Sequence, residues 1–134
     1  MYLLDTNIVS YFLRGASAAL NQRILDSTPD TLAISIISAG ELRYGLRRLK
    51  PSRRANELAR QLDALLSAVA VQALPATAAQ HYGDIRALLE SRGTPIGGND
   101  LWIAAHALAQ NLTLVTNNTR EFERVPSLQL ENWL

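Results

Sequence analysis

Met1-Tyr2-Leu3-Leu4-Asp5-Thr6-Asn7-Ile8-Val9 is the stretch that decides the fold of this chain. Its apolar run from Tyr2 to Leu4 predicts a short buried strand that ends at a carboxylate. Val9, Phe12 and Leu13 have the i, i+3, i+4 spacing of an apolar helix face. Asp5 therefore lies where a strand ends and a helix begins. Ligands of open parallel α/β sheets bind beyond the carboxyl ends of the strands, so Asp5 is the first candidate site residue.

Predicted strands and helices alternate along the rest of the chain, with no repeat and no low-complexity linker. Further strands are predicted at 32–36, 69–74, 112–116 and 128–130; helices are predicted at 16–27, 38–49, 52–67, 76–92 and 99–110, with one helical turn at 119–123. This order predicts an α/β fold, a three-layer domain with a mostly parallel central sheet of four to five strands flanked by helices. We expect residues 1–134 to form a single domain.

Composition excludes several classes of protein. The 48% hydrophobic and 19% charged content is that of a globular chain and not of a disordered one. The net charge of +1 excludes polyanion binding by bulk charge alone. The absence of cysteine excludes disulfides and thiolate metal sites. No signal peptide or membrane-spanning run is present, so we expect a soluble cytoplasmic domain that does not bind a membrane.

Four groups of polar residues follow predicted strands or begin predicted helices: Asp5-Thr6-Asn7, Glu41, Asn99-Asp100 and Thr116-Asn117-Asn118. Each group alone has a structural explanation. Asp5 is a helix cap, and the segment 38–41 matches the S-x-x-E capping box. Asp100 is favoured by the dipole of the helix it begins, and Asn117 or Asn118 caps the next turn.

The positions of these groups, taken together, favour a second interpretation. Parallel strands end on one edge of a sheet, so Asp5, Glu41 and Asn118 are expected to converge there. Carboxylates that converge repel one another unless a cation lies between them. Ligand sets made only of oxygen suit a hard ion, Mg²⁺ or Mn²⁺. Such ions keep several waters, and metal-activated water is a nucleophile for phosphodiester cleavage.

The same residues resemble a known family. Asp5-Thr6-Asn7, the Glu41 helix, the block from Pro95 to His106 (PIGGNDLWIAAH) and the block from Leu114 to Phe122 (LVTNNTREF) are similar to the motifs of PIN domains. More narrowly they resemble the VapC toxins of bacterial toxin–antitoxin pairs, over Met1 to Trp133. The resemblance implies a Mg²⁺-dependent endoribonuclease, usually a homodimer, that a VapB antitoxin inhibits by forming a hetero-oligomer.

By position, the resemblance implies that Asp5 and Asp100 are the main metal ligands and that Glu41 completes the catalytic cluster. The family often has a fourth acid after its last long strand, where this chain has Asn118, so a second metal ion is in doubt. Glu121 is one replacement for that acid, and Asp84 is a weaker one. The supporting residues are thus Thr6, Asn7, Asn99, Thr116, Asn118 and Glu121.

The implied reaction is attack by water on the phosphodiester, which leaves a 5′-phosphate and a 3′-hydroxyl. The metal-free alternative uses the 2′-hydroxyl of RNA and a pair of histidines. His81 and His106 are the only histidines, and both lie in predicted helices. We interpret them as packing or surface residues and set the metal-free route aside.

Basic residues are concentrated around the Glu41 helix. Positions 43–54 carry six of the thirteen basic side chains: Arg43, Arg47, Arg48, Lys50, Arg53 and Arg54. We predict that Arg43, Arg47 and Arg48 contact RNA phosphates, although the same arginines would also suit an acidic antitoxin tail. Tyr44 is a candidate for stacking on a base, for the core or for a dimer contact. Gly45, inside its helix, suggests close packing by another backbone.

Two other functions are weighed against the ribonuclease. A catalytically weak or inactive PIN-like module that holds RNA or a partner would explain Asn118 in the place of an acid. An aspartyl-phosphate phosphatase also starts with a strand that ends in aspartate, but it needs a second acid where this chain has Asn7. For the ribonuclease, the resemblance suggests tRNA as the substrate, with initiator tRNA cut in its anticodon region as the leading hypothesis.

Overall fold

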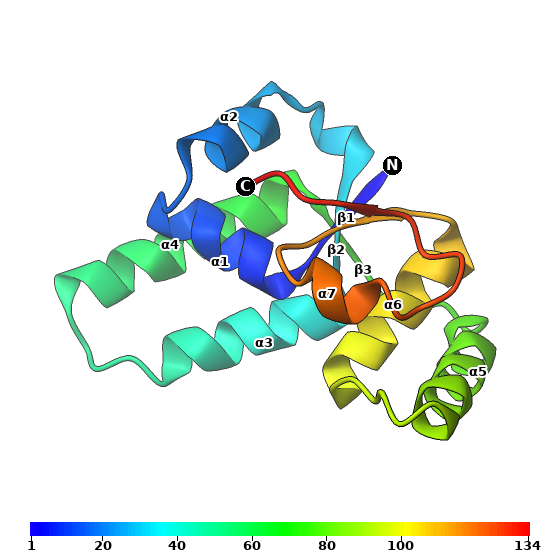
Figure 1. The fold of residues 1–134 in the computed structure, drawn as a ribbon. Coiled ribbons are helices and arrows are strands. Elements are labelled where there is room, and N and C mark those ends of the chain that lie inside the picture. The colour runs from blue at the N-terminus through cyan, green and yellow to red at the C-terminus, as the bar shows by residue number, and fades with distance from the viewer.

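One five-stranded parallel sheet, in the order β3–β2–β1–β4–β5, organises the computed structural model, which describes all 134 residues (Figure 1). Its strands are β1 (Tyr2–Leu4), β2 (Leu32–Ser35), β3 (Ala70–Gln72), β4 (Thr113–Val115) and β5 (Leu130–Glu131). Every neighbouring pair is parallel. The predicted sheet is therefore confirmed, and the opening stretch of the sequence supplies its central strand.

Helices cover both faces of this sheet. They are α1 (Thr6–Arg14), α2 (Ala18–Asp26), α3 (Ile36–Arg47), α4 (Arg53–Ala68), α5 (Ala78–Ser91), α6 (Gly98–Gln110) and α7 (Thr119–Phe122), with a 3-10 turn at Pro29–Thr31. Successive residues of a strand point to opposite faces. Leu3 accordingly packs with residues of α5 and α6, whereas Leu4 packs with residues of α1, α2 and α4. The three-layer prediction is confirmed. None of the helices has the length and apolar composition that crossing a bilayer requires.

The carboxyl ends of β1, β2 and β4 lie on one rim of the sheet because these strands are parallel neighbours. The backbone N–H of Asp5 donates to the carbonyl oxygen of Val115 at 2.9 Å and so extends the β1–β4 pairing by one residue. α1 begins immediately after Asp5, and α3 begins immediately after Ser35, the last residue of β2. Side chains at these junctions are therefore brought to a common edge.

Two local predictions on α3 are wrong. The helix starts at Ile36, and Ser35 is its cap, with its Oγ accepting the N–H of Ile37 at 3.2 Å. Ser38 therefore lies inside the helix and no capping box forms, which leaves the Glu41 carboxylate available to other elements. Close packing at Gly45 is absent as well, since a Cβ at that position would meet no atom within 4 Å.

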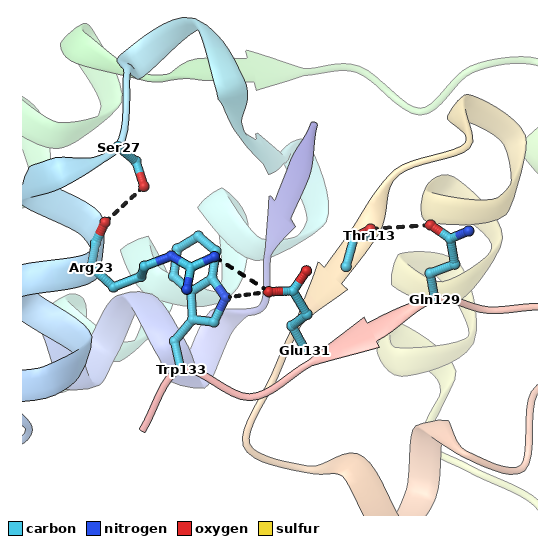
Figure 2. A network of polar contacts seen from close by, with 6 residues as sticks. All are labelled: Arg23, Ser27, Thr113, Gln129, Glu131 and Trp133. Atoms are coloured by element: carbon cyan, nitrogen blue, oxygen red, sulfur yellow. Dashed lines mark hydrogen bonds and ion pairs between the residues drawn. The ribbon is translucent and has the colours of Figure 1, made fainter.

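The C-terminal segment packs against α2, as Figure 2 shows. Glu131 of β5 accepts hydrogen bonds from Nε1 of Trp133 at 3.0 Å and from Arg23 of α2 at 3.5 Å. The Arg23 guanidinium lies 4.6 Å from the centre of the Trp133 ring, and Tyr2 meets that ring edge-on at 4.9 Å. The ion pair itself is exposed and contributes little. The aromatic contacts are what hold this segment over the start of β1.

Candidate active site

Asp5 lies at the centre of the rim, and only 3% of its surface is exposed. Its Oδ1 accepts the backbone N–H of Thr6 at 2.8 Å, so it caps α1 as predicted. Its Oδ2 accepts the hydroxyl of Thr116 at 2.9 Å. Burial raises the pKa of Asp5; the two hydrogen bonds oppose that rise, and the charge of Glu41 adds to it. The two hydrogen bonds to Asp5 therefore do not compensate for its burial, and its charged form is disfavoured.

Glu41 reaches the rim from α3. Its Oε1 accepts the hydroxyl of Thr6 at 2.6 Å, and its Oε2 accepts Nδ2 of Asn99 at 3.3 Å. The Thr6 hydroxyl is also 2.9 Å from Oγ of Ser38. Thr6 has one proton to give, so Ser38 donates to Thr6 while Thr6 donates to Glu41. The chain of donors from Ser38 to Thr6 to Glu41 fixes the position of the carboxylate.

Sequence reasoning missed Ser38. This residue is fully buried, and its assignment to a capping box concealed its contact with Thr6. The available signal was its spacing, because residues three apart in a helix share a face and Ser38 precedes Glu41 by three positions.

Asp100 lies in the first turn of α6, as predicted. Its pKa is raised to about 6, first by burial and then by the charges of Asp5, Glu121 and Glu41, with a hydrogen bond to Glu121 adding to the rise. Four acids from separate parts of the chain thus act on one another. Asp84 is exposed on α5 and is not among the charges that act on Asp100, so it does not replace the missing acid.

Asn118 occupies the position where the family often has its fourth acid. Its side chain does not cap α7, contrary to one prediction. Instead its Nδ2 donates to Oε2 of Glu121 at 2.8 Å, and its backbone N–H donates to Oγ1 of Thr116 at 2.9 Å. Asn118 therefore holds a carboxylate, supplied by Glu121, beside Asp100.

The chemistry of this cluster fits a divalent cation. None of the four ion pairs in the structure involves any of its carboxylates, so no basic side chain offsets their charge. The carboxylate atoms that would bind a metal ion are all oxygens, which hard ions prefer. No three acidic or histidine side chains stand close enough together to enclose an ion as they are. An Mg²⁺ ion that keeps several waters needs only one or two direct carboxylates, so this spacing still fits.

The remaining predicted residues are more dispersed. Asn7 is exposed and lines a cavity of about 190 Å³ together with Thr6 and Glu41. At 100° per residue, Arg48 comes within about 20° of Glu41 around α3, while Arg43 and Arg47 lie on other sides. Arg43 instead pairs with Asp63 of α4 at 2.6 Å. The structure therefore does not group Arg43 and Arg47 with the acids, and it leaves Arg48 as the predicted arginine on the Glu41 side.

The raised pKa of Asp100 predicts how stability depends on pH. Between the ordinary value of 3.8 and about 6, the folded protein binds more protons at Asp100 than the unfolded chain does. The free energy of unfolding therefore falls as pH rises through this window. We expect the Tm of the metal-free protein, measured relative to Asp100→Asn, to fall across it, and Mg²⁺ to restore the Tm only at its upper end. Identical pH profiles for the two proteins would contradict this.

Comparison with known proteins identifies the family. The family model described as PIN domain matches residues 2–128. The chain belongs to the PIN-domain family. Ribonuclease VapC2 of Rickettsia felis is 42% identical over 134 residues, covering 99% of this chain and 98% of the relative. The tRNA(fMet)-specific endonuclease VapC of Shigella flexneri is 36% identical over 132 residues, covering 98% of this chain and 97% of the relative.

Solved structures agree with this assignment. A crystal structure of VapBC2 from Rickettsia felis, bound to a DNA fragment from their promoter, contains a chain that superimposes with a TM-score of 0.87 at 40% identity. The match covers 99% of this PIN domain and 98% of that chain. The resemblance to VapC toxins is confirmed, and this PIN domain belongs to the VapC ribonucleases of toxin–antitoxin pairs.

Proposed function

We propose that this VapC-type PIN domain is a Mg²⁺-dependent endoribonuclease that acts as a single domain on tRNA in the cytoplasm, with initiator tRNA as its leading substrate. The observation that carries the metal dependence is the convergence of four carboxylates that form no ion pair with a basic side chain. Burial, and then the charges of the other three acids, raise the pKa of Asp100 to about 6. The substrate is supported by relatives described as tRNA(fMet)-specific endonucleases.

Asp5, Glu41 and Asp100 would hold the ion, one or two of them directly and the others through its waters, and Mn²⁺ would be accepted in its place. When bound, the ion supplies positive charge opposite the phosphate oxygens and makes water more acidic. Hydroxyl donors keep two of the carboxylates oriented: Thr116 bonds Oδ2 of Asp5, and Thr6 bonds Oε1 of Glu41. These bonds hold the ligands in place before substrate arrives, so less reorganisation is needed during the reaction.

Glu121 is the residue we assign to accept the proton of the attacking water. Asn118 holds its Oε2, and its charge helps to raise the pKa of Asp100, which places it beside the cluster. Water that loses its proton to Glu121 attacks phosphorus, the bond between phosphorus and the 3′-oxygen breaks, and that oxygen takes up a proton from solvent. The products carry a 5′-phosphate and a 3′-hydroxyl.

Arg48 and Tyr44 are the proposed contacts for the RNA strand. The Arg48 guanidinium lies 5.5 Å from the centre of the Tyr44 ring, and 65% of Tyr44 is exposed. Both lie on the Glu41 side of α3. The Arg48 guanidinium suits a phosphate, and the exposed Tyr44 ring suits a stacked base.

A VapB-type antitoxin is the proposed inhibitor, supported by structural neighbours that are VapBC complexes. A groove between α1, α3 and α4 suits a segment of such a partner. It runs from Thr6, Asn7 and Glu41 past leucine side chains to Arg14, where it meets a second hollow lined by Lys50 and Arg54. Its apolar floor and basic end would accept an amphipathic segment with acidic residues at one end.

A homodimer is proposed through the N-terminal end of α3. Ile36 is 49% exposed and lines a hollow with the half-buried Ile37 beside Glu41. Exposed apolar side chains gathered around one hollow are typical of a protein interface. A second copy on this side would bring two active sites close together.

The test is to incubate the purified protein with total tRNA and Mg²⁺ and to map the new ends by sequencing. We expect one or a few tRNAs to be cut in the anticodon region, with 5′-phosphate ends. Addition of the cognate antitoxin should stop the reaction, and size-exclusion chromatography should give the mass of a dimer. A tRNA pool that stays intact at high protein concentration would refute the substrate proposal.

A further inference from the structure

His106 is a fully buried titratable residue that the proposed chemistry does not use. It lies on α6, six residues after Asp100. Its Nδ1 is 3.0 Å from Oγ of Ser35, and its Nε2 is 3.0 Å from Oε1 of Gln72. Ser35 ends β2 and caps α3, while Gln72 ends β3. One imidazole ring therefore connects the Asp100 helix, the start of the Glu41 helix and an edge strand.

The hydrogen bonds determine which ring nitrogen carries the proton. The Gln72 oxygen can only accept, so Nε2 of His106 is the donor there. Nδ1 then accepts the Ser35 hydroxyl proton, and Ser35 Oγ still has a lone pair for the N–H of Ile37. Burial lowers the pKa of His106, which favours the same neutral ring. Both ring nitrogens of His106 and the Ser35 hydroxyl are satisfied in this arrangement.

Two polar links join α3 to α6. Ser35 meets His106 at one end, and Glu41 meets Asn99 at the other. The order of these residues means that the two helices run in opposite directions past one another. The two links are six residues apart on α3, about 9 Å at 1.5 Å per residue. Because helices of this length are stiff, a shift at the histidine end carries through to the carboxylate end.

We infer that His106 is a positioning residue: by fixing the N-terminus of α3 against α6, it sets how Glu41 meets Asp100. His106 touches neither the substrate nor the metal ion of the proposed reaction. Its influence on cleavage rests on the proposed function, whereas its influence on the geometry of the two helices does not.

Two substitutions separate positioning from general stability. His106→Asn keeps an acceptor for the Ser35 hydroxyl, and His106→Leu fills similar volume with no polar atom. The control is Leu20→Ala, which opens a cavity on α2, where the fully buried Leu20 lies away from the rim. All three should lower the Tm, so the Tm alone does not decide the question.

Calorimetric titration of MgCl₂ into the RNA-free protein provides the first deciding readout. We expect His106→Leu to weaken Mg²⁺ binding by about tenfold or more, as changes behind metal ligands do. His106→Asn should stay within about threefold of the wild type, and Leu20→Ala should bind Mg²⁺ as the wild type does. Equal Mg²⁺ affinity in His106→Leu and Leu20→Ala would overturn the inference.

A second readout does not depend on metal or cleavage. Nitrogen NMR of the wild-type ring should show the proton on Nε2, and hydrogen exchange at Ile37 should accelerate in His106→Leu but not in Leu20→Ala. A proton on Nδ1, or unchanged exchange at Ile37, would overturn the inference. If the wild type neither binds Mg²⁺ nor cuts RNA, the proposed function fails, and the exchange and NMR results still decide the role of His106.

Discussion

Replacing Asp5 with asparagine is expected to lower kcat for RNA cleavage by about 10²- to 10³-fold while leaving the fold intact. Losses of this size occur when one preorganised charge or donor is removed from an active site. Asparagine is as good a helix cap as aspartate, so its oxygen can still accept the N–H of Thr6. The substitution therefore removes the charge while keeping the shape and the cap.

Stability should change in the opposite direction from activity. The folded-state pKa of Asp5 is raised above its ordinary value of 3.8, so the ionised group at neutral pH works against folding. Asp5→Asn removes that cost, and we expect a metal-free Tm equal to or above that of the wild type. The increase in Tm that Mg²⁺ produces in the wild type should be lost. Differential scanning calorimetry with and without Mg²⁺ measures both effects.

Asp30→Asn is the matched control because Asp30 is exposed in the turn before β2. It should leave both cleavage and the response to Mg²⁺ unchanged. A wild type that binds tRNA without cutting it, and whose binding is insensitive to Asp5→Asn, would favour the non-catalytic binding module. Full cleavage by Asp5→Asn would exclude the cluster around Asp5 as the active site.

Removal of divalent cations by a chelator is expected to abolish cleavage, and addition of Mg²⁺ or Mn²⁺ should restore it. The four carboxylates have no basic partner, so without a cation nothing offsets their repulsion of a phosphodiester. Oxygen ligands with no histidine or cysteine favour Mg²⁺ and Mn²⁺ over softer ions. Initial rates over a titration of each metal after chelation provide the measurement.

Full activity in excess chelator would require the metal-free route through the 2′-hydroxyl of RNA. That route needs a pair of histidines exposed to the substrate. His106 is fully buried and has both ring nitrogens hydrogen-bonded, so only His81 would be available. Unchanged cleavage with chelator, lost in His81→Ala, would replace the metal-dependent proposal.

Sequence patterns predicted the elements of this fold well because those patterns are local. The apolar run before Asp5 gave the central strand, and helical spacing located each long helix to within a few residues. The three principal acids could be chosen as candidates for the same reason, since each comes directly after a strand or lies near the start of a helix. Their common rim then resulted from the parallel order of the strands.

Sequence patterns were a poor guide to which group a polar side chain bonds. One interpretation gave Glu41 a bond to the backbone of its own helix, but Glu41 instead bonds Thr6, 35 residues earlier in the chain. Arg43 pairs with Asp63 on the neighbouring helix, which spacing did not indicate, and its contact with RNA stays a prediction. A hydrogen bond or ion pair forms with whichever group packing brings within about 3 Å, and spacing along one helix does not reveal that group.

The sequence by itself determined the order of strands and helices, the parallel sheet and the identity of the principal acids. These features depend on apolar periodicity and on the polar residues just after each strand, and both are properties of neighbouring residues in the chain. Tertiary structure alone decided that Asn118 bonds Glu121, that Ser38 supports Glu41 through Thr6, and that His106 joins α3 to α6. Each of these depends on how separate elements pack, because only packing brings such distant side chains within hydrogen-bonding reach.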